Sequence, residues 1–388
     1  TFTAQAINAI GTGVASATSP SATPAGLPTP PTSISATIGD GQVTLAFSGA
    51  GANGSAITNY TVIAEPGGLT GTSSSSPVTV LGLTNGVAYT FRVLATNAVG
   101  DSDSSTVSVT ATPATVPNAP SSISATSGNA SAQITFTAPT SNGGAAITSY
   151  TVTASPGGQS CTVSAPSTGC TVNGLNNGTT YSFTVTATNA AGTSSPSGSS
   201  NSVTPVGPPA APVLDTLVRG DTKANLTFTP PTITGGLPID HYEVIIQPGN
   251  LVVTTNSSSV EVPNLVNGTL YTVTVVAVNG AGTSAPSNSK TVRPAGIPNA
   301  PTVVAGYPAN QAARLEFSGA TGNGAPITGY IITVVETGDT FTVTSSPHTV
   351  HGLTNGTPYS FTVATVTSVG VSAPSTISAP VTPEQVSY

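Results

Sequence analysis

The chain of 388 residues contains only 6 Lys or Arg and 13 Asp or Glu residues, so charged residues make up 5% of it against about 25% in ordinary domains. So few cations cannot hold a nucleic-acid backbone, and this excludes nucleic acid as a partner. No apolar run is long enough to span a bilayer, so we expect no membrane insertion in this segment. An apolar content of 37% with regular alternation argues against disorder.

A repeat of about 90 residues organises the chain. The stretch GLTNGVAYTFRVLATNAVG at 82–100 returns in related form at 174–192, 264–282 and 352–370, and residues 1–11 are similar to its end. In each full copy a Leu stands six residues before a Tyr, as in Leu83 and Tyr89. A unit of this size can bury a core of its own, so we predict four complete domains.

The predicted domains cover residues 25–114, 115–206, 207–295 and 296–388, preceded by the last two strands of a partial domain at 1–24. Those two strands, at 2–8 and about 14–23, cannot fold alone. Either a neighbouring segment completes them or another chain does so by strand addition; the first explanation is the simpler one. Pro-rich joints at 113–120, 205–212 and 294–301 favour extended, stiff connections, and hence an elongated rod.

The first complete domain predicts seven short antiparallel strands. Apolar residues alternate with polar ones near 34–38, 43–47, 57–62, 69–72, 78–83, 89–96 and 106–112, and turn residues separate the runs. The turns at 39–41 and 85–86 are rich in Gly, Asp and Asn. No segment has helical periodicity, so the sequence indicates an all-β protein of antiparallel sandwiches.

These patterns together resemble the fibronectin type III domain, in the form that secreted bacterial proteins carry. The resemblance covers nearly the whole chain and rests on a Tyr in the third strand, the Leu-x5-Tyr pair and the Asn-Ala-x-Gly that follows it. It implies immunoglobulin-like, seven-stranded sandwiches with no catalysis or cofactor of their own. It also implies a structural tyrosine corner, in which the hydroxyl ties the sixth strand to the preceding crossover. The corner residues are Tyr89, Tyr181, Tyr271 and Tyr359. One departure is consistent, because Phe47, Phe136, Phe228 and Phe317 stand where the family usually has Trp.

Cys161 and Cys170 flank a loop in the second complete domain. We predict that they form a disulfide, which would add about 3 kcal/mol in the chain-entropy picture and would indicate an oxidising compartment. Free thiols or a metal pair are the alternatives. Residues 117–205 contain no Asp, Glu, Lys, Arg or His, so a zinc site lacks the remaining ligands.

Arg219, Gly220 and Asp221 spell the integrin-binding tripeptide. The adhesive copy in the family lies between the last two strands, whereas this one lies between the first two. A Gly-Asp turn explains it without adhesion. His348 and His351 lie on a strand, where positions three apart point to opposite faces, and His241 has no partner signature.

Asp101 and Asp103 form a close acid pair that we interpret as a solvated loop, because calcium requires more oxygen ligands. Glycosylation is a further hypothesis, either O-linked on the Ser- and Thr-rich surface or N-linked. The possible N-linked sites are Asn53, Asn59, Asn129, Asn177, Asn225, Asn256, Asn267 and Asn355. In Asn177, Asn267 and Asn355 the Asn-Gly-Thr sequence has a turn-forming reason of its own.

The sequence contains no recognisable set of nucleophile and base, so we expect a protein that is not an enzyme. The first hypothesis is a non-catalytic extracellular structural protein at the cell surface: a rod-like stalk, or a subunit of a bacterial filament or sheath. The alternative is a spacer or binding region of a secreted adhesin or carbohydrate-active enzyme whose functional domain lies outside this segment. The expected partners are other copies of the chain, other cell-surface proteins, and polysaccharide.

Overall fold

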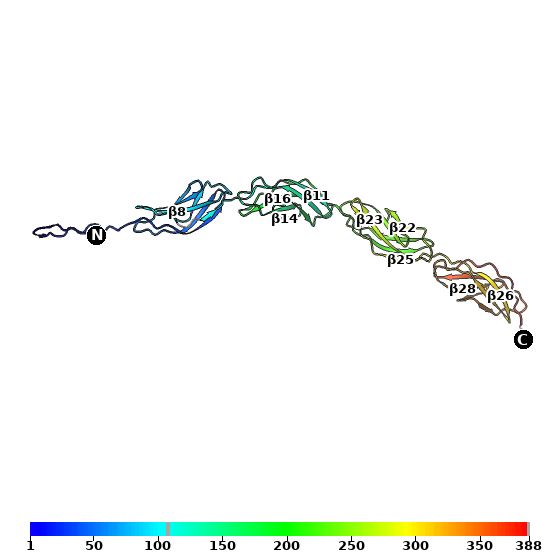
Figure 1. Ribbon diagram of the computed structural model, residues 1–388. Helices are drawn as coiled ribbons and strands as arrows, with labels where there is room; N and C mark the ends of the chain where they lie inside the picture. Colours follow the sequence, from blue (N-terminus) through cyan, green and yellow to red (C-terminus); the bar gives the residue numbers. More distant parts are fainter. Residues whose placement is uncertain (106–108, 386–388) are drawn as a thin grey trace. The chain divides into compact units, whose positions relative to one another are not determined.

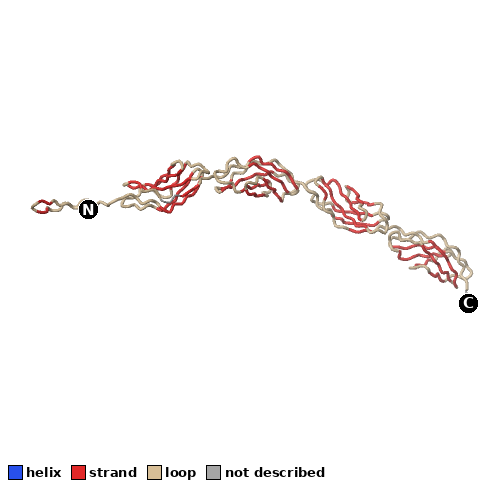
Figure 2. The backbone as a smooth tube through the Cα atoms, viewed as in Figure 1, coloured by secondary structure: helices blue, strands red, loops and turns tan. Residues whose placement is uncertain are grey.

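The computed structural model describes residues 1–105 and 109–385, and it is all-β: no helix occurs in these two ranges. The chain divides into two compact units, Thr1–Pro205 and Val206–Tyr388. Each unit contains two sandwiches, and in every sandwich two antiparallel sheets face each other (Figures 1 and 2). The predicted fold class is therefore confirmed.

The first unit begins with a hairpin whose regular strands are β1 (Ile7–Asn8) and β2 (Gly11–Thr12). Backbone hydrogen bonds continue the pairing outward, because the N–H groups of Gly13, Ser16 and Ser19 donate to the carbonyls of Ala6, Ala4 and Phe2. The two arms expected at 2–8 and 14–23 thus lie side by side, but most of their length is not regular strand. The donors in one arm are three residues apart and the acceptors in the other arm are two residues apart, so a regular antiparallel ladder cannot form.

The first complete domain packs a three-stranded sheet, in the order β3-β4-β7, against a second sheet in the order β6-β5-β8-β10, with β9 paired to β8. The strands are β3 (Thr32–Gly39), β4 (Gln42–Ser48), β5 (Asn59–Glu65), β6 (Leu69–Ser73), β7 (Val78–Leu81), β8 (Tyr89–Asn97), β9 (Gly100–Asp101) and β10 (Val109–Ala111). The strand predicted at 106–112 is seen as β10, while residues 106–108 lie outside the described ranges.

The second domain has the sheets β11-β12-β15 and β14-β13-β16-β17. Its strands are β11 (Ser121–Gly128), β12 (Ser131–Thr137), β13 (Ser149–Ser155), β14 (Ser160–Ser164), β15 (Gly169–Asn173), β16 (Ser182–Asn189) and β17 (Gly192–Thr193). Buried Val, Ile, Phe and Ala side chains from both sheets form its core.

The third and fourth domains, in the second unit, repeat this plan. The third pairs β18-β19-β22 with β21-β20-β23-β24 and β25, and the fourth pairs β26-β27-β30 with β29-β28-β31. The third contains β18 (Val213–Arg219), β19 (Ala224–Thr229), β20 (Ile239–Gln247), β21 (Leu251–Thr255), β22 (Ser259–Val262), β23 (Tyr271–Asn279), β24 (Gly282–Thr283) and β25 (Lys290–Val292). The fourth contains β26 (Thr302–Ala309), β27 (Ala312–Ser318), β28 (Ile327–Val334), β29 (Thr340–Val343), β30 (His348–His351) and β31 (Phe361–Thr367).

A Phe–Tyr pair joins the two sheets of every sandwich; both rings are buried in the first three domains, and Tyr330 of the fourth is partly buried. The Phe lies on the second strand and the Tyr on the third, so the two residues come from opposite sheets. The ring centroids are 5.0 Å apart for Phe47–Tyr60 and Phe136–Tyr150, and 4.8 Å apart for Phe228–Tyr242 and Phe317–Tyr330. All four pairs are tilted or edge-on, the arrangements that aromatic rings favour. The tyrosine ring thus supplies the partner that lets Phe fill the core where the family usually has Trp.

The stretch that follows the last hairpin of each domain pairs with the sixth strand partly through serine hydroxyls, and in the first and third domains a short regular strand, β10 or β25, continues this pairing. In the second domain the N–H groups of Val185 and Ala187 donate to the hydroxyl oxygens of Ser197 and Ser194, at 2.9 and 3.0 Å. Each hydroxyl in turn donates to the carbonyl of the next residue, at 2.7 and 2.8 Å. Because the serines recur every third residue and their partners every second, the segment is not a regular strand. The hydroxyls nevertheless satisfy the buried donors that a missing ladder would leave unpaired.

The Asn of the Asn-Ala-x-Gly motif connects the last hairpin to the start of its domain. The buried Asn189 accepts hydrogen bonds from the N–H groups of Ala191 and Gly192, at 2.8 and 3.1 Å, which closes the turn. Its side-chain amide donates to the carbonyls of Thr115 and Asn142, at 2.8 and 2.7 Å. One side chain therefore holds the turn, the entering chain and a loop together.

Candidate functional site

The four tyrosine corners have the same geometry in all four domains. The hydroxyls of Tyr89, Tyr181, Tyr271 and Tyr359 each accept a hydrogen bond from the backbone N–H five residues earlier, at 3.1 to 3.2 Å. Each ring is buried, and so is the Leu six residues before it. The hydroxyl therefore caps the crossover that leads into the sixth strand.

A different tyrosine set lies on the third strand, where burial raises the pKa of Tyr150 and of Tyr242 above the usual phenol value.

A second recurrent contact, which the sequence patterns did not reveal, clamps two turns together in every domain. An Asn after the fifth strand accepts a hydrogen bond from a backbone N–H in the turn between the first two strands, at 2.8 to 2.9 Å. Its amide donates to the Asp or Asn side chain of that same turn, at 2.6 to 2.8 Å. The pairs are Asn85 with Asp40, Asn177 with Asn129, Asn267 with Asp221, and Asn355 with Asn310. In the sequence, the feature that could have predicted this contact is a pair of turns, about 45 residues apart, that recur together in every repeat.

This clamp engages three of the predicted glycosylation sites, Asn177, Asn267 and Asn355. In each of them the amide nitrogen, the atom that an N-linked glycan would occupy, already donates a hydrogen bond to the opposite turn. An N-linked glycan replaces one of the two amide hydrogens, so at Asn267, where both hydrogens donate, it would have to displace the bond to Asp221 or the bond to Asn323.

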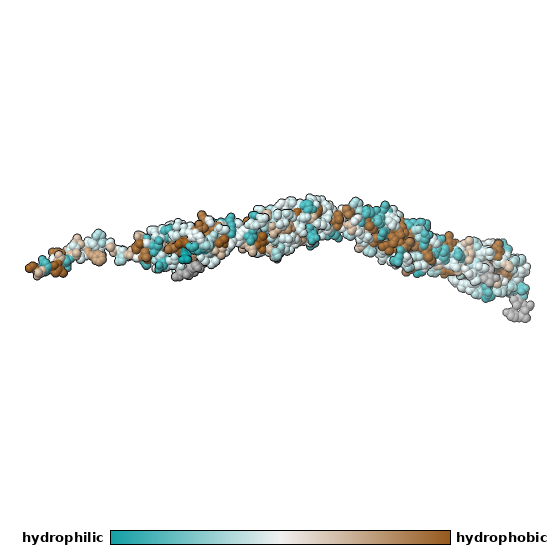
Figure 3. Space-filling model, turned by 45° about the horizontal axis from the view of Figure 1, so that its top comes forward, coloured by the Kyte–Doolittle hydropathy of each residue, from teal (hydrophilic) through white to brown (hydrophobic). Residues whose placement is uncertain are grey.

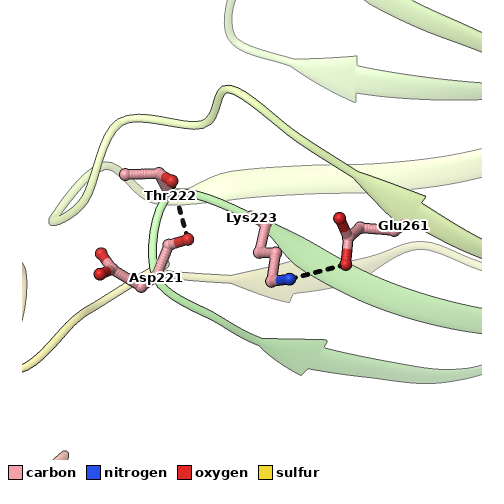
Figure 4. A network of polar contacts seen from close by, with 4 residues as sticks. All are labelled: Asp221, Thr222, Lys223 and Glu261. Atoms are coloured by element: carbon pink, nitrogen blue, oxygen red, sulfur yellow. Dashed lines mark hydrogen bonds and ion pairs between the residues drawn. The ribbon is translucent and has the colours of Figure 1, made fainter.

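The tripeptide Arg219, Gly220 and Asp221 lies at the end of β18 and in the turn before β19. Asp221 is the acid of the clamp in the third domain, and its carboxylate accepts from Asn267 at 2.6 Å. Its carbonyl accepts from the Thr222 hydroxyl at 2.7 Å, and its carboxylate points away from Lys223, which pairs with Glu261 at 2.8 Å instead (Figure 4). The acid of the tripeptide is thus already bound within the domain.

The same turn also contacts the fourth domain, which belongs to the same unit. The second hydrogen of the Asn267 amide donates to Asn323 at 2.8 Å, and the Arg219 guanidinium donates to the Ser368 hydroxyl at 3.3 Å. Gly324 has a positive φ of 96°, and a Cβ there would approach the Gly268 nitrogen to 2.6 Å. Only glycine allows the two backbones to approach this closely. In the tripeptide, Arg219 therefore bonds directly to the fourth domain, and Asp221 is linked to the joint through Asn267.

Cys161 and Cys170 are joined by a disulfide, with their Cα atoms 6.4 Å apart. Cys161 lies on β14 opposite Val152, and Cys170 lies on β15 opposite Ile134. Because β14 and β15 belong to different sheets, the bridge links the two layers of the second domain. Both cysteines are half-buried and pack against the core, and no free cysteine occurs in the described part of the chain.

The remaining candidates lie apart from one another. His348 and His351 are at opposite ends of β30, and His241 lies 3.7 Å from the Glu243 carboxylate. Asp101 accepts from the Thr96 hydroxyl at 2.6 Å, and the carbonyl of Asp103 accepts from Ser102 at 2.8 Å. Within residues 1–105 and 109–385, no three His, Cys, Asp or Glu residues are grouped as metal ligands would be.

Glu336 is a charged residue with a shifted pKa. Partial desolvation acts to raise the pKa of its carboxyl, but hydrogen bonds from Ser360 and from its own backbone outweigh this and hold the pKa below the usual value. The Ser360 N–H lies 2.9 and 2.8 Å from the two carboxylate oxygens.

Residues 1–105 and 109–385 contain no helix that is long and apolar enough to cross a bilayer. One surface hollow is lined by turn residues of the first and second domains, all of them uncharged: Asn85, Gly86, Val87, Thr115, Ser141, Asn142, Gly143 and Gly144.

Comparison with known proteins identifies the family. The family model of the fibronectin type III domain matches residues 29–111, 118–203, 210–293 and 300–381. The chain therefore belongs to the fibronectin type III family and carries four of its domains in tandem. Residues 1–24 lie outside the four matches.

Three curated relatives match parts of the chain. A Kelch domain-containing protein of Saccharolobus solfataricus is 39% identical over 31% of this chain, and Chitinase A1 of Niallia circulans is 34% identical over 39%. Exoglucanase B of Cellulomonas fimi is 31% identical over 55%. The matched segments span only 17%, 22% and 20% of these three relatives. The similarity to the two bacterial proteins supports the bacterial type of the domains.

Proposed function

We propose that the chain is the non-catalytic spacer of a secreted bacterial protein that acts on polysaccharide, and that it holds functional domains apart outside the cell. The observation that carries this proposal is the tandem array of four family domains, together with its similarity to segments of a chitinase and an exoglucanase. In a variant of this proposal, the array is the stalk of a secreted adhesin instead of the spacer of an enzyme.

The disulfide supports the extracellular location, because such bonds persist mainly in oxidising compartments. The polar groups of the described residues also support a non-catalytic role. Turn asparagines, corner tyrosines and ladder serines bond to the backbone or to each other, and so serve the structure.

The joints support a spacer rather than a loose tether. Proline fixes the backbone of each connection, as at Pro205, Pro208 and Pro209. Within the second unit the joint adds hydrogen bonds between Asn267 and Asn323, and between the Gly296 N–H and the Asn323 carbonyl at 3.0 Å. Such contacts limit the angles that neighbouring domains can adopt.

Electron microscopy of the native material tests this proposal. Single particles in which the array connects to a different globular domain would support the spacer. Continuous fibres with a regular axial repeat would contradict it, and would make the chain a structural polymer. Hydrolysis of cellulose or chitin by residues 25–383 alone would overturn the non-catalytic role.

One observation favours the polymer as a second candidate, a subunit of a surface filament or sheath. Residues 117–205 carry no charged side chain, so copies of this domain repel each other weakly. Analytical ultracentrifugation separates the two candidates. A polymer-forming chain will self-associate as its concentration rises, whereas a chain that stays monomeric over a hundredfold range of concentration would exclude the polymer.

A further inference from the structure

One outer sheet face of the second domain presents a hydroxyl group at nearly every position. Its residues come from β14, β13, β16 and β17 and all are Ser or Thr: Ser160, Thr162, Ser164, Ser149, Thr151, Thr153, Ser155, Ser182, Thr184, Thr186, Thr188 and Thr193. We call these residues the hydroxyl face. They point outward because the alternate residues, such as Tyr150 and Val152 on β13, are buried in the core.

The strand register arranges the hydroxyl face as a grid. Thr151 lies opposite Thr162 on one side and Thr186 on the other, while Thr153 lies opposite Ser160 and Thr184. The residues that carry these hydroxyl groups are thus spaced about 4.8 Å apart across the strands and about 6.7 Å apart along them. Hydrogen bonds of 3.0 Å link Thr151 to Thr162 and Thr188 to Thr193, which fixes these side chains.

The corresponding faces of two other domains have a different composition. In the first domain this face includes Glu65 and Arg92. In the third it includes Glu243 and Ile245, and the side chains of β23 contribute further Val residues. On the side shown in Figure 3 the second domain is mostly pale, the colour of weakly polar residues, whereas the third carries brown apolar patches. The repeat therefore does not by itself require an uncharged hydroxyl grid.

We infer that the hydroxyl face binds the surface of an ordered, uncharged polysaccharide. Each Thr offers a hydroxyl group and a methyl group, which match the hydroxyl and C–H groups of a sugar polymer. A single hydrogen bond exchanged with water contributes little, so a short soluble sugar gains little from this face. A solid with regularly placed hydroxyl groups can engage many grid positions at once, and the weak contacts then act together. The choice of polysaccharide rests on the proposed function, but the grid itself does not.

Adsorption of the whole chain to crystalline cellulose and to crystalline chitin tests this inference. We expect at least one of the two solids to deplete the chain from solution. The bound fraction should not change between about 0.1 M and about 1 M salt, although the Debye length falls from about 10 to about 3 Å over this range. Cellohexaose and chitohexaose in solution should bind too weakly to compete. If neither solid retains the chain, the inference fails, while the spacer proposal still depends on the microscopy.

The decisive variant replaces four hydroxyl groups by methyl groups at nearly constant shape: T151V/T153V/T184V/T186V. Its matched control, T333V/T340V/T342V/T362V, makes the same change on the corresponding sheet face of the fourth domain, formed by β28, β29 and β31. Both variants make the same four Thr→Val changes, so the difference between them reports on the hydroxyl face.

We expect the second-domain variant to adsorb about tenfold more weakly than the control, which corresponds to about 1.4 kcal/mol. Equal adsorption of the two variants would overturn the inference. The single substitution Thr153→Lys is a second test that does not depend on four changes being tolerated. It places a charge at an exposed grid position and should also weaken adsorption, whereas unchanged adsorption would count against the hydroxyl face.

Discussion

The side-chain amide of Asn267 donates to the carboxylate of Asp221 at 2.6 Å, although the two residues are 46 positions apart. The same amide reaches Asn323 in the next domain, and its oxygen accepts from the Thr222 N–H at 2.9 Å. One asparagine therefore links two turns of the third domain and contacts the joint to the fourth. This contact explains the position of Asp221 without adhesion, and integrin binding through Arg219, Gly220 and Asp221 stays a prediction.

Substituting Asp221 by Ala removes the acceptor that fixes the Asn267 amide. We expect the third domain to lose about 0.5–1.5 kcal/mol of stability, and its first turn to open more often. Native-state hydrogen exchange at the Thr222 amide measures this directly, because that N–H donates to Asn267.

The control is Asp221→Asn, which retains a side-chain oxygen. Asn129 and Asn310 fill the same position in the second and fourth domains, so the clamp should persist. Faster exchange in the Asn variant than in the Ala variant would contradict this account of the turn.

The tyrosine corner predicts a loss of stability when its hydroxyl is removed. In Tyr359→Phe the N–H of Thr354, now 3.2 Å from the phenol oxygen, loses its partner in a partly buried site. We expect a cost of about 1–2 kcal/mol in the fourth domain, measured by thermal unfolding. Tyr307→Phe is the control, because that ring is 46% exposed and its contact with Arg314 needs only the ring face. A larger effect at Tyr307 than at Tyr359 would contradict a structural role for the corner.

The strands could be predicted because burial alternates along them with a period of two. In β8, for example, Tyr89, Phe91 and Val93 are buried while Thr90 and Arg92 are exposed. The serine-paired stretch after the last hairpin of each domain could not be predicted in this way, because its serines repeat every third residue while their partners repeat every second. Its pairing depends on side-chain hydroxyls, which a pattern of apolar residues does not reveal.

The clamp between the turns was missed for a different reason. Asn85 and Asp40 each fit a turn on local grounds, so neither residue needed a distant partner. Their contact follows from the way the two sheets bring both turns to one end of the sandwich, and this is tertiary information. The disulfide could be predicted without tertiary information, because Cys161 and Cys170 are the two cysteines of the chain.

Acid should weaken the fourth domain through Glu336. Because hydrogen bonds from Ser360 and from its own backbone lower the pKa of this carboxyl in the folded state, its contribution to stability is complete above the unfolded pKa, about 4.3. It is lost as the pH falls through the lower, folded value. Glu336→Gln should remove this part of the acid dependence in unfolding curves at pH 3 and pH 7. An unchanged pH dependence in the variant would show that the carboxylate does not contribute.

Reduction of the disulfide should destabilise the second domain alone. The bridge closes a loop with a sequence separation of 9, for which the chain-entropy relation gives about 3 kcal/mol. Cys161→Ser with Cys170→Ser should lower the melting temperature of this domain as much as a reductant does. The other three domains lack cysteine and serve as internal controls in the same sample. A uniform shift of all transitions would mean that the reductant acts by another route.

The serine ladder leads to a prediction for Ser197, whose buried hydroxyl accepts from the Val185 N–H at 2.9 Å and donates to the Gly198 carbonyl at 2.7 Å. In Ser197→Ala both groups lose this partner, and the buried N–H cannot turn to water. We expect a loss of about 1–3 kcal/mol and faster hydrogen exchange at Val185. Ser195→Ala, two residues away and exposed, removes a hydroxyl outside the ladder and should change neither quantity. Equal effects of the two substitutions would show that the last segment is held by its backbone bonds, such as Ser197 N–H to the Val185 carbonyl at 2.9 Å, and not by the hydroxyl.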